Sequence, residues 1–147
     1  SATAEWIMLV GVPGTGKTHI LAAVVNALWG RPFVAGPIDT FLGDIKAAAY
    51  GDDGQSSLNR AVMKLYRGRS AFIVDELGVG KLSEQDRAAL DALLNFAYAD
   101  CVPVIMATNL DADARAAFFG ARIVSRFKEM GARIECVWPS LRRREEP

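Results

Sequence analysis

The sequence predicts an α/β fold built on a mainly parallel sheet, and three observations support this. Short apolar runs of strand length alternate along the chain with segments whose apolar residues recur at helical spacing. Two of the runs, Trp6–Val10 and Ala71–Val74, are apolar throughout, which is typical of strands covered on both faces. The first run leads into a glycine-rich stretch and then a helix pattern. Such alternation is typical of layered domains with helices over the faces of a sheet.

The composition limits the domain count and the class of partner. The chain has 147 residues, enough for one domain with a sizeable core, and we expect this core at residues 1–138 with a charged tail at 139–147. Seventeen Lys and Arg balance seventeen Asp and Glu, so any binding to nucleic acid needs a local basic patch. No membrane span or signal peptide is visible, and a cytoplasmic protein is the default expectation.

The two cysteines and the position of the first residue lead to two further predictions. Cys101 and Cys136 fit no metal-binding or redox spacing and are expected to be buried, reduced thiols. The chain begins at Ser1, almost directly on the first strand pattern. We therefore expect a natural N-terminal part that precedes this sequence.

The glycine-rich stretch Gly11–Thr18, GVPGTGKT, fits the pattern of a phosphate-binding loop. The strand pattern before it and the helix pattern after it are the context that this motif requires. Glycines tolerate positive φ and carry no side chain, so backbone N–H groups can converge on phosphate oxygens at the positive end of the helix. The residues expected to contact a nucleotide are Gly11, Val12, Pro13, Gly14, Thr15, Gly16, Lys17, Thr18 and His19.

Two side chains of the loop have expected chemical roles. Lys17 can reach the β- and γ-phosphates, and Thr18 offers a hydroxyl to Mg²⁺. A chance glycine-rich turn is the alternative, which the flanking strand and helix disfavour. His19 is the only histidine and has no metal-binding partner in the sequence, so a partly exposed helix position is its simpler interpretation.

Between the loop and residue 51 the pattern predicts two helices and a strand. The helix after the loop is stopped by Gly30 and Pro32. Phe33–Ala35 is predicted as a short strand. Asp39 is the expected N-cap of the next helix, which Gly51 ends.

A polar loop at Gly51–Ser57 is expected to lead into a helix at Leu58–Tyr66. One side of this helix is apolar and faces inward. The other side and the residues that follow are basic: Arg60, Lys64, Arg67 and Arg69. These residues are either a contact surface for DNA or a solvated helix face.

The second half of the chain begins with the strand Ala71–Val74. Ser83 and Asp86 form a variant of the capping box and predict the start of a long helix. Val102–Ala107 is the next predicted strand. Asp111 can cap a short helix that ends near Gly120.

The last predicted elements are a helix at Ala121–Met130, stopped by Gly131, and a strand at Arg133–Val137. Strands and helices therefore alternate along almost the whole chain, as a parallel α/β sheet requires.

Polar residues follow two of the predicted strands. Asp75 and Glu76 come after Val74, and Asn109 comes after the later strand. Acidic residues at the end of a buried strand are costly unless they are used, and ligands bind at this edge of open α/β sheets. We expect Asp75 to hold Mg²⁺ with Thr18, and Glu76 to act as the general base toward water. Asn109 is expected to orient that water or touch the γ-phosphate, the alternative being an Asx turn.

Arg122 and Arg126 stand one helical turn apart and share a face of their predicted helix. Neither has an evident acidic partner on that face. They form either a solvated basic face or a source of positive charge for ATP on a neighbouring subunit.

Together these motifs resemble the AAA+ ATPases of the DnaC/IstB group, which includes replicative helicase loaders and transposition helper ATPases. The order and spacing match from Trp6 to Arg142. The stretches that carry the resemblance are GVPGTGKTHILAAVVNAL, AFIVDELG, VIMATNLD and ARIVSRF.

The resemblance implies a three-layer phosphate-loop NTPase fold with a five-stranded, mainly parallel sheet and no helical lid domain. It implies ATP rather than GTP, with Mg²⁺. The implied site is Lys17 and Thr18 as Walker A, Asp75 and Glu76 as Walker B, Asn109 as sensor 1, Arg126 as the arginine finger, Arg122 as a supporting arginine, and Arg142 near the nucleotide.

The resemblance also implies a helicase loader in DNA replication that self-associates and assembles on single-stranded DNA with a replicative helicase. The helicase contact is expected through a segment before Ser1. In the segment Pro37–Gly51, which helps relatives contact DNA, Lys46 is the sole basic residue. A transposition helper ATPase and an ATP-dependent switch with little turnover are the alternatives.

Overall fold

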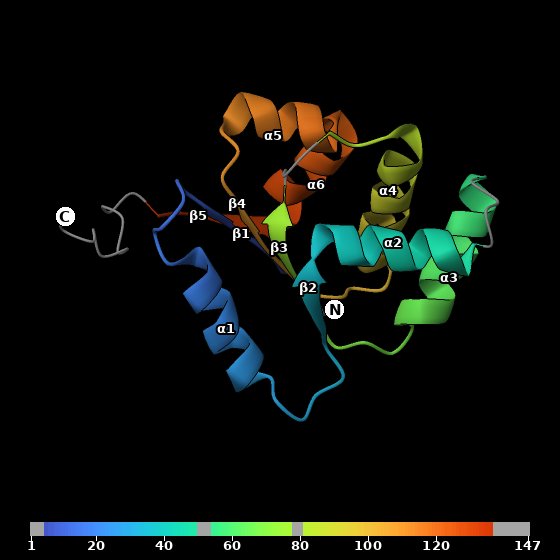
Figure 1. The fold of residues 1–147 in the computed structure, drawn as a ribbon, viewed down its shortest axis with the longest axis horizontal. Coiled ribbons are helices and arrows are strands. Elements are labelled where there is room, and N and C mark those ends of the chain that lie inside the picture. Colours follow the sequence, from blue (N-terminus) through green and yellow to red (C-terminus); the bar gives the residue numbers. More distant parts are fainter. Residues whose placement is uncertain (1–4, 50–53, 78–80, 137–147) are drawn as a thin grey trace, which may run out of the picture.

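The computed structural model describes residues 5–49, 54–77 and 81–136 of the chain. Five strands form one sheet in the order β2-β3-β4-β1-β5, and all paired neighbours are parallel (Figure 1). The strands are β1 (Trp6–Val10), β2 (Val34–Pro37), β3 (Phe72–Leu77), β4 (Val104–Thr108) and β5 (Gly131–Glu135). The predicted α/β fold with a mainly parallel sheet is confirmed.

Helices cover both faces of the sheet, with more of them on one face than on the other. The helices are α1 (Lys17–Ala27), α2 (Ile38–Ala48), α3 (Gln55–Tyr66), α4 (Glu84–Ala99), α5 (Ala112–Phe119) and α6 (Ala121–Met130). Figure 1 shows α1 apart from the others, along one face of the sheet. The remaining helices supply buried or partly buried side chains to a single large core on the opposite face.

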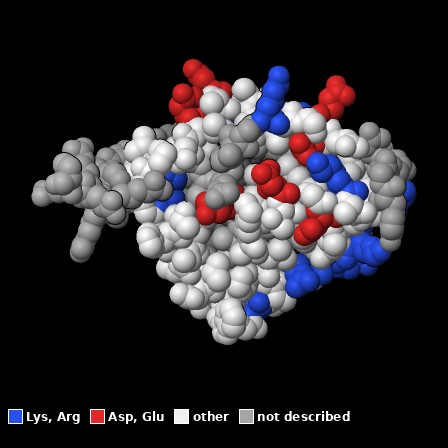
Figure 2. All heavy atoms as spheres, viewed as in Figure 1, with Lys and Arg blue, Asp and Glu red and all other residues white. Residues whose placement is uncertain are grey.

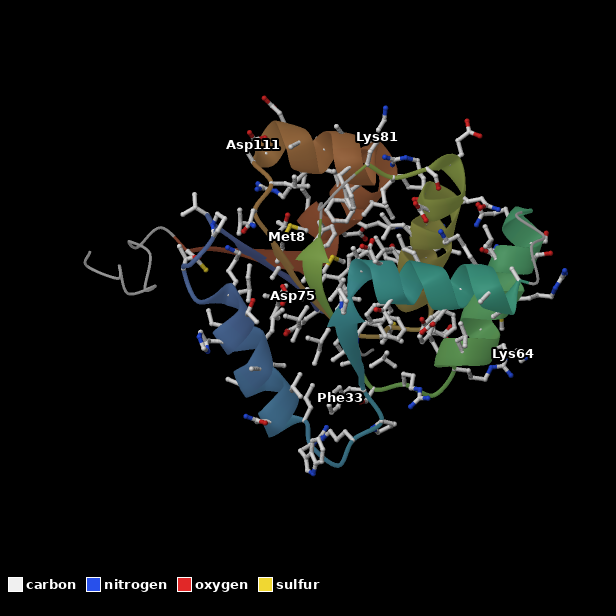
Figure 3. The ribbon with its side chains drawn as sticks, viewed as in Figure 1. Met8, Phe33, Lys64, Asp75, Lys81 and Asp111 are labelled. Carbon is white, nitrogen blue, oxygen red and sulfur yellow. The ribbon has the colours of Figure 1, made fainter. Side chains whose placement is uncertain are left out.

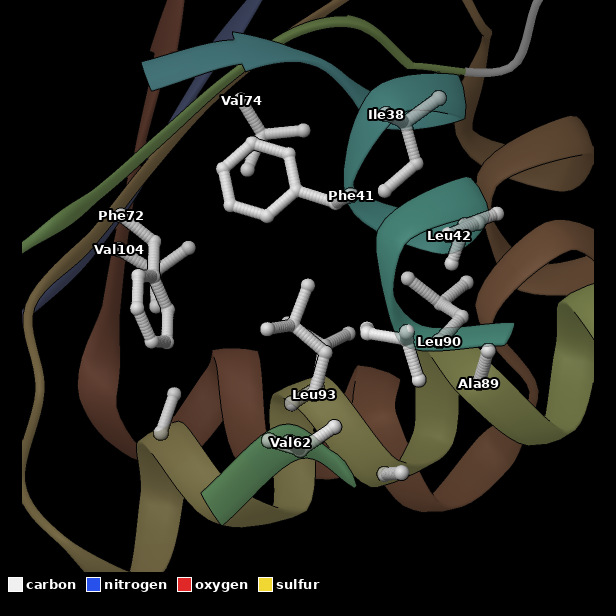
Figure 4. Close-up of a cluster of buried hydrophobic side chains, with 14 of the residues drawn as sticks. Ile38, Phe41, Leu42, Val62, Phe72, Val74, Ala89, Leu90, Leu93 and Val104 are labelled. Atoms are coloured by element: carbon white, nitrogen blue, oxygen red, sulfur yellow. The ribbon is translucent and has the colours of Figure 1, made fainter. Parts of the chain in front are cut away.

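The two faces have separate hydrophobic clusters because successive side chains of a strand point to opposite sides. Phe72 and Val74 of β3 point into the large core, where they meet α2 and α4 (Figure 4). Ile73, between them, belongs to a small cluster with Leu21 of α1. The sheet is therefore buried on both sides, as its apolar strands predict.

Two helix starts differ from the sequence-based expectation. Asp39 does not cap α2, because α2 begins at Ile38 with Pro37 in the N-cap position and no side-chain cap. Asp39 lies instead in the first turn, where its negative charge interacts favourably with the positive end of the helix dipole. Helix α3 begins at Gln55 rather than Leu58, so the polar residues expected in a loop form its first turn.

Four strands also differ in their bounds, since β2 spans Val34–Pro37 rather than Phe33–Ala35 and β4 spans Val104–Thr108 rather than Val102–Ala107. Strand β3 does not end at Val74 but continues through Asp75 and Glu76 to Leu77. Strand β5 begins at Gly131, two positions before the expected Arg133. A Cβ on Gly131 would lie 2.6 Å from the Phe127 carbonyl oxygen, so the absence of a side chain lets the chain pass directly from α6 into β5.

The two predicted helix caps are confirmed, and one of the two cysteine predictions is wrong. Ser83 and Asp86 form the capping box of α4, and Asp111 caps α5 by accepting from the Ala114 N–H. Cys136 is buried as expected, but Cys101 is exposed, at φ 53°, in the turn after α4.

Candidate nucleotide-binding site

The phosphate-binding loop joins the carboxyl end of β1 to the start of α1. Gly14 and Gly16 have φ of 85° and 84°, which other residues adopt only with strain. Gly11 is fixed by close packing, since a Cβ there would lie 2.7 Å from the Cys136 carbonyl oxygen. The glycines of the motif thus meet steric needs of this fold as well as of a ligand.

The side chain of Lys17 lies within the loop and is only 8% exposed. Its ammonium group donates hydrogen bonds to the carbonyl oxygens of Gly11, at 2.7 Å, and Val12, at 2.8 Å. It also contacts the hydroxyl of Thr15 at 3.3 Å. The loop therefore holds a positive charge at its centre, where an anion bound to the backbone amides would meet it.

Thr15 is a second buried residue of the loop, and the sequence pattern places it only among the expected nucleotide contacts. Its side chain is fully buried and its hydroxyl donates to the Val12 carbonyl oxygen at 2.9 Å. It closes the turn internally and supplies one of the contacts of Lys17. In the sequence, its position between two glycines of the motif was the signal that could have indicated this structural role.

The loop meets strand β3 through Thr18 and Asp75. The Thr18 hydroxyl donates to Asp75 Oδ2 at 3.2 Å, across 57 positions of sequence. Asp75 lies near the carboxyl end of β3, which carries it to the edge of the sheet that the loop occupies (Figure 3). The predicted proximity of these two residues is confirmed.

This pair suits a magnesium ion. A hydroxyl and a carboxylate are hard oxygen donors, and Mg²⁺ is commonly held by one or two protein carboxylates with phosphate oxygens and water completing its shell. Within the described residues, no cluster of three or more His, Cys, Asp or Glu could hold a metal by itself. Thr18 and Asp75 thus fit an ion that arrives with a phosphate ligand.

An irregularity in the sheet lies at the acidic pair. Val74 is paired with Met106 and Leu77 with Thr108, so Asp75 and Glu76 together span the interval that Ala107 alone fills on β4. Such a bulge bends the strand and changes the direction of its side chains, and bulges are frequent beside functional sites. Glu76 lies on this bulge, and its side chain is outside the described part of the structure.

Asn109 follows β4 directly and is exposed. The neighbouring Thr108 pairs with Val10 in the sheet register, and its carbonyl oxygen accepts from the Gly11 N–H at 3.3 Å. The backbone next to Asn109 therefore touches the first residue of the phosphate-binding loop. This places Asn109 at the same sheet edge as the loop, as its sequence position predicts.

The two arginines of α6 have different surroundings. Arg126 is half-buried, donates to the side-chain oxygen of Asn95 on α4, and lies 4.1 Å from the centre of the Tyr98 ring. Arg122 is exposed. It is close enough to Asp91 of α4 to oppose, with Arg87, the rise that burial causes in the pKa of that carboxyl.

The sequence pattern missed the partners of Arg126. Asn95 and Tyr98 lie one helical turn apart on α4, 31 and 28 positions before the arginine, and no local spacing links the two helices. Arg126 is thus held by residues of the same chain in this structure.

The remaining predicted contacts are peripheral or outside the described residues. Val12, Pro13, Thr18 and His19 are exposed around the loop. Arg142 lies outside the described residues. A groove of about 300 Å³ runs beside Thr18 and Asp75, between α1 and the edge strand β2, and is lined by Leu21, Val25, Pro37 and Ile73.

The basic residues of the α3 region are exposed, as predicted. Figure 2 shows Lys and Arg gathered along one margin of the molecule, over α3, and Figure 3 shows Lys64 pointing away from the core. Lys46 is different, because its ammonium group forms an ion pair with Asp86 of α4 at 2.6 Å.

Comparison with known proteins gives a family match over most of the chain. The model of the ATPase family associated with various cellular activities (AAA) matches residues 7–130. The uncharacterized protein YdaV of Escherichia coli (strain K12) is 29% identical over 135 residues, which cover 90% of this chain and 53% of YdaV. The chain therefore spans about half the length of that relative.

Solved structures share the fold. The replication initiator DnaA bound to AMPPCP and single-stranded DNA superimposes with a TM-score of 0.70 at 22% identity, covering 91% of this chain and 40% of DnaA. The crystal structure of DnaI gives a TM-score of 0.67 at 21% identity, covering 90% of this chain and 73% of DnaI. At these identities the likeness establishes the fold. Every helix in the described residues is too short or too polar to span a membrane.

Proposed function

The chain belongs to the AAA family of ATPases, and we propose that it is the ATP-hydrolysing domain of a helicase loader that acts in DNA replication in the cytoplasm. The observation that carries the proposal is the hydrogen bond between Thr18 and Asp75. It brings the phosphate-binding loop and the acidic strand end together. The likeness to DnaA and DnaI supports the replication role at the level of fold.

Each residue of the site has a distinct task in this proposal. Lys17 and the loop amides bind the phosphates of ATP, and Thr18 with Asp75 holds Mg²⁺, which supplies positive charge beside the phosphates. Glu76 accepts the proton of the attacking water, and Asn109 orients that water. The bulge at Asp75 and Glu76 supports this division, because it places two successive acidic residues opposite one residue of β4, near the end of the strand.

The proposed partners are single-stranded DNA, a replicative helicase and further copies of this chain. The exposed basic residues of the α3 region, Arg60, Lys64, Arg67 and Arg69, are the proposed DNA contact. Lys46 contributes less, since its charge is paired with Asp86. With zero net charge, DNA binding by one subunit is expected to be weak and sensitive to salt.

In this proposal, the arginines of α6 take part in self-association. The proposed arginine finger is Arg126, acting on ATP in the neighbouring subunit, with Arg122 in support. Because Arg126 contacts Asn95 and Tyr98 of its own subunit, assembly has to release it from these partners. An arginine finger supplied by a partner is typically worth about 10³–10⁵ in rate.

The test mixes two inactive variants. Lys17→Ala removes phosphate binding but keeps Arg126, and Arg126→Ala keeps an intact nucleotide site. On a single-stranded DNA scaffold the mixture should hydrolyse ATP faster than either variant alone, because one subunit supplies the site and its neighbour the arginine. Lys128→Ala, an exposed change on the same helix, in place of Arg126→Ala is the matched control, and it should retain most turnover by itself.

The outcomes separate the alternatives. No rescue on mixing, with turnover strictly linear in protein concentration, would contradict action across an interface. Nucleotide binding without measurable turnover in the wild type would favour the ATP-dependent switch. A preference for duplex over single-stranded DNA in stimulating turnover would favour a transposition helper of the same group.

A further inference from the structure

The short connection between β4 and α5 is fixed at its central residue from two sides. The Leu110 N–H donates to the Thr108 hydroxyl at 3.0 Å, and the Leu110 carbonyl oxygen accepts from Arg115 Nη1 at 2.7 Å. Asp111, the next residue, accepts from the Ala114 N–H at 2.8 Å. Both polar groups of the Leu110 backbone are therefore held, and Asn109 lies between this anchor and the end of the strand.

Thr108 connects the same segment to the phosphate-binding loop. Its side chain is 2% exposed, and it lies opposite Val10 in the sheet. Its carbonyl oxygen accepts from the Gly11 N–H at 3.3 Å, while its hydroxyl accepts from the Leu110 N–H. One buried residue thus contacts the first residue of the loop on one side and the Asn109 connection on the other.

We propose that Thr108 and Arg115 are positioning residues that fix the direction of the Asn109 side chain relative to the phosphate-binding loop. Asn109 is exposed, and the direction of its side chain follows from its backbone, which joins Thr108 to the anchored Leu110. This inference rests on the proposed function, in which Asn109 orients the attacking water. Neither residue touches the nucleotide in this proposal.

The physical reason is that a reacting water has to be held within a narrow range of positions and angles. A displacement of about 1 Å can cost 10²-fold in rate without a comparable loss of binding. Replacing the Thr108 hydroxyl with a methyl group leaves the Leu110 N–H without its acceptor. Because an unpaired backbone N–H is unfavourable, the backbone at Leu110 is expected to rotate toward another acceptor. The loop and Lys17 keep their own contacts, so affinity for ATP should change little.

The test compares Thr108→Val with Thr108→Ser. Valine keeps the shape but removes the acceptor, whereas serine keeps the hydroxyl. Thr108→Val should lower kcat by about 10²-fold with KM and ATP affinity changed less than threefold, and Thr108→Ser should restore most of the rate. Hydrogen exchange at the Leu110 amide should accelerate in Thr108→Val and not in Thr108→Ser.

Two further variants test the connection to Asn109. The double variant Thr108→Val with Asn109→Ala should be no slower than Asn109→Ala alone, because both changes remove the same oriented amide. Arg115→Gln should lower kcat in the same direction by a smaller factor. Asp113→Asn, an exposed change on the same helix, is the control and should leave kcat unchanged.

Failure of this inference differs from failure of the proposed function. If the wild type turns over ATP but Thr108→Val keeps its kcat, or the Thr108 and Asn109 effects multiply, the positioning role is wrong. If Thr108→Val loses ATP affinity in parallel with rate, Thr108 acts in general folding of the loop instead. A wild type that binds ATP without turnover would overturn the proposed function, and this inference with it.

Discussion

The two faces of the sheet differ in what covers them. On one face, α2, α3, α4, α5 and α6 enclose a core of large side chains that includes Trp6, Phe41, Phe72 and Leu93. On the other, among the described residues, α1 is the one helix that covers a small cluster, whose buried members are Leu9, Leu21, Ile73 and Ala107. Beside α1 a groove of about 300 Å³ reaches the Thr18–Asp75 pair.

The aromatic residues sharpen this difference. Phe72 contacts Phe41, Tyr66 and Phe96 with ring centres 5.2–6.4 Å apart, and Trp6 packs edge-on against Phe127 at 4.9 Å. These rings lie on the face covered by α2 to α6, which we call the many-helix face; the other is the α1 face. Each such pair adds to the stability that burial provides. The α1 face has smaller side chains and carries the start of the helix that bears Lys17 and Thr18. We infer that the many-helix face supplies most of the stability and the α1 face most of the chemistry.

The largest expected effect comes from one substitution made on each face. Leu93→Ala on the many-helix face should cost about 4 kcal/mol of unfolding free energy, because neighbours on α2 and α3 cannot close the cavity. Leu21→Ala should cost about 2 kcal/mol, because Leu21 borders the open groove and loses fewer contacts. Urea unfolding of both variants measures the difference. Equal losses would show that α1 is as tightly packed as the other helices.

A smaller effect should appear at high pH on the many-helix face. Burial, followed by the charge of Asp44, raises the pKa of Tyr66 from 10.0 to about 12. Since the folded pKa lies above the unfolded one, the contribution of Tyr66 to stability is complete below pH 10.0 and is lost as the pH rises toward 12. Ultraviolet titration of tyrosinate should show a late step that Tyr66→Phe removes. An early ionisation of every tyrosine would mean that water reaches this core.

The smallest expected effect concerns the ion pair between α2 and α4. The hydrogen bond from Lys46 is the main cause that holds the pKa of Asp86 below its usual value. The pair therefore stabilises the fold above the unfolded pKa of Asp86, and this stability is lost as the pH falls through the lower folded pKa. Because both side chains are partly exposed, Lys46→Met should cost only about 0.5 kcal/mol.

The control for this pair is Lys81→Met, which removes an exposed lysine near the start of α4. Thermal unfolding of both variants at low and high salt is the measurement. The Lys46→Met effect should shrink at high salt, since exposed charges are screened. An effect of the same size at every salt concentration would indicate lost packing of the lysine stem rather than a lost charge.

Much of the fold could be predicted from local patterns. The apolar runs indicated β1 and β4, the phosphate-binding loop indicated the start of α1, and Ser83 and Asp111 indicated the starts of α4 and α5. These signals are local, because a cap or a loop is made by residues within a few positions of one another. At Asp39 and at residues 55–57 the helix boundaries differ from those that the local signals indicated.

Residue types and their order along the chain determined the candidate chemistry: a lysine in a glycine loop, acids in one strand and an asparagine after another. Tertiary structure alone decided how these groups meet. The contact of Thr18 with Asp75 depends on which strands become neighbours, and the bulge at Asp75 and Glu76 depends on the pairing of β3 with β4. The hold of Asn95 and Tyr98 on Arg126 arises from the packing of α4 beside α6. Those contacts join groups whose separation along the chain carries no periodic signal, so only the folded chain brings them together.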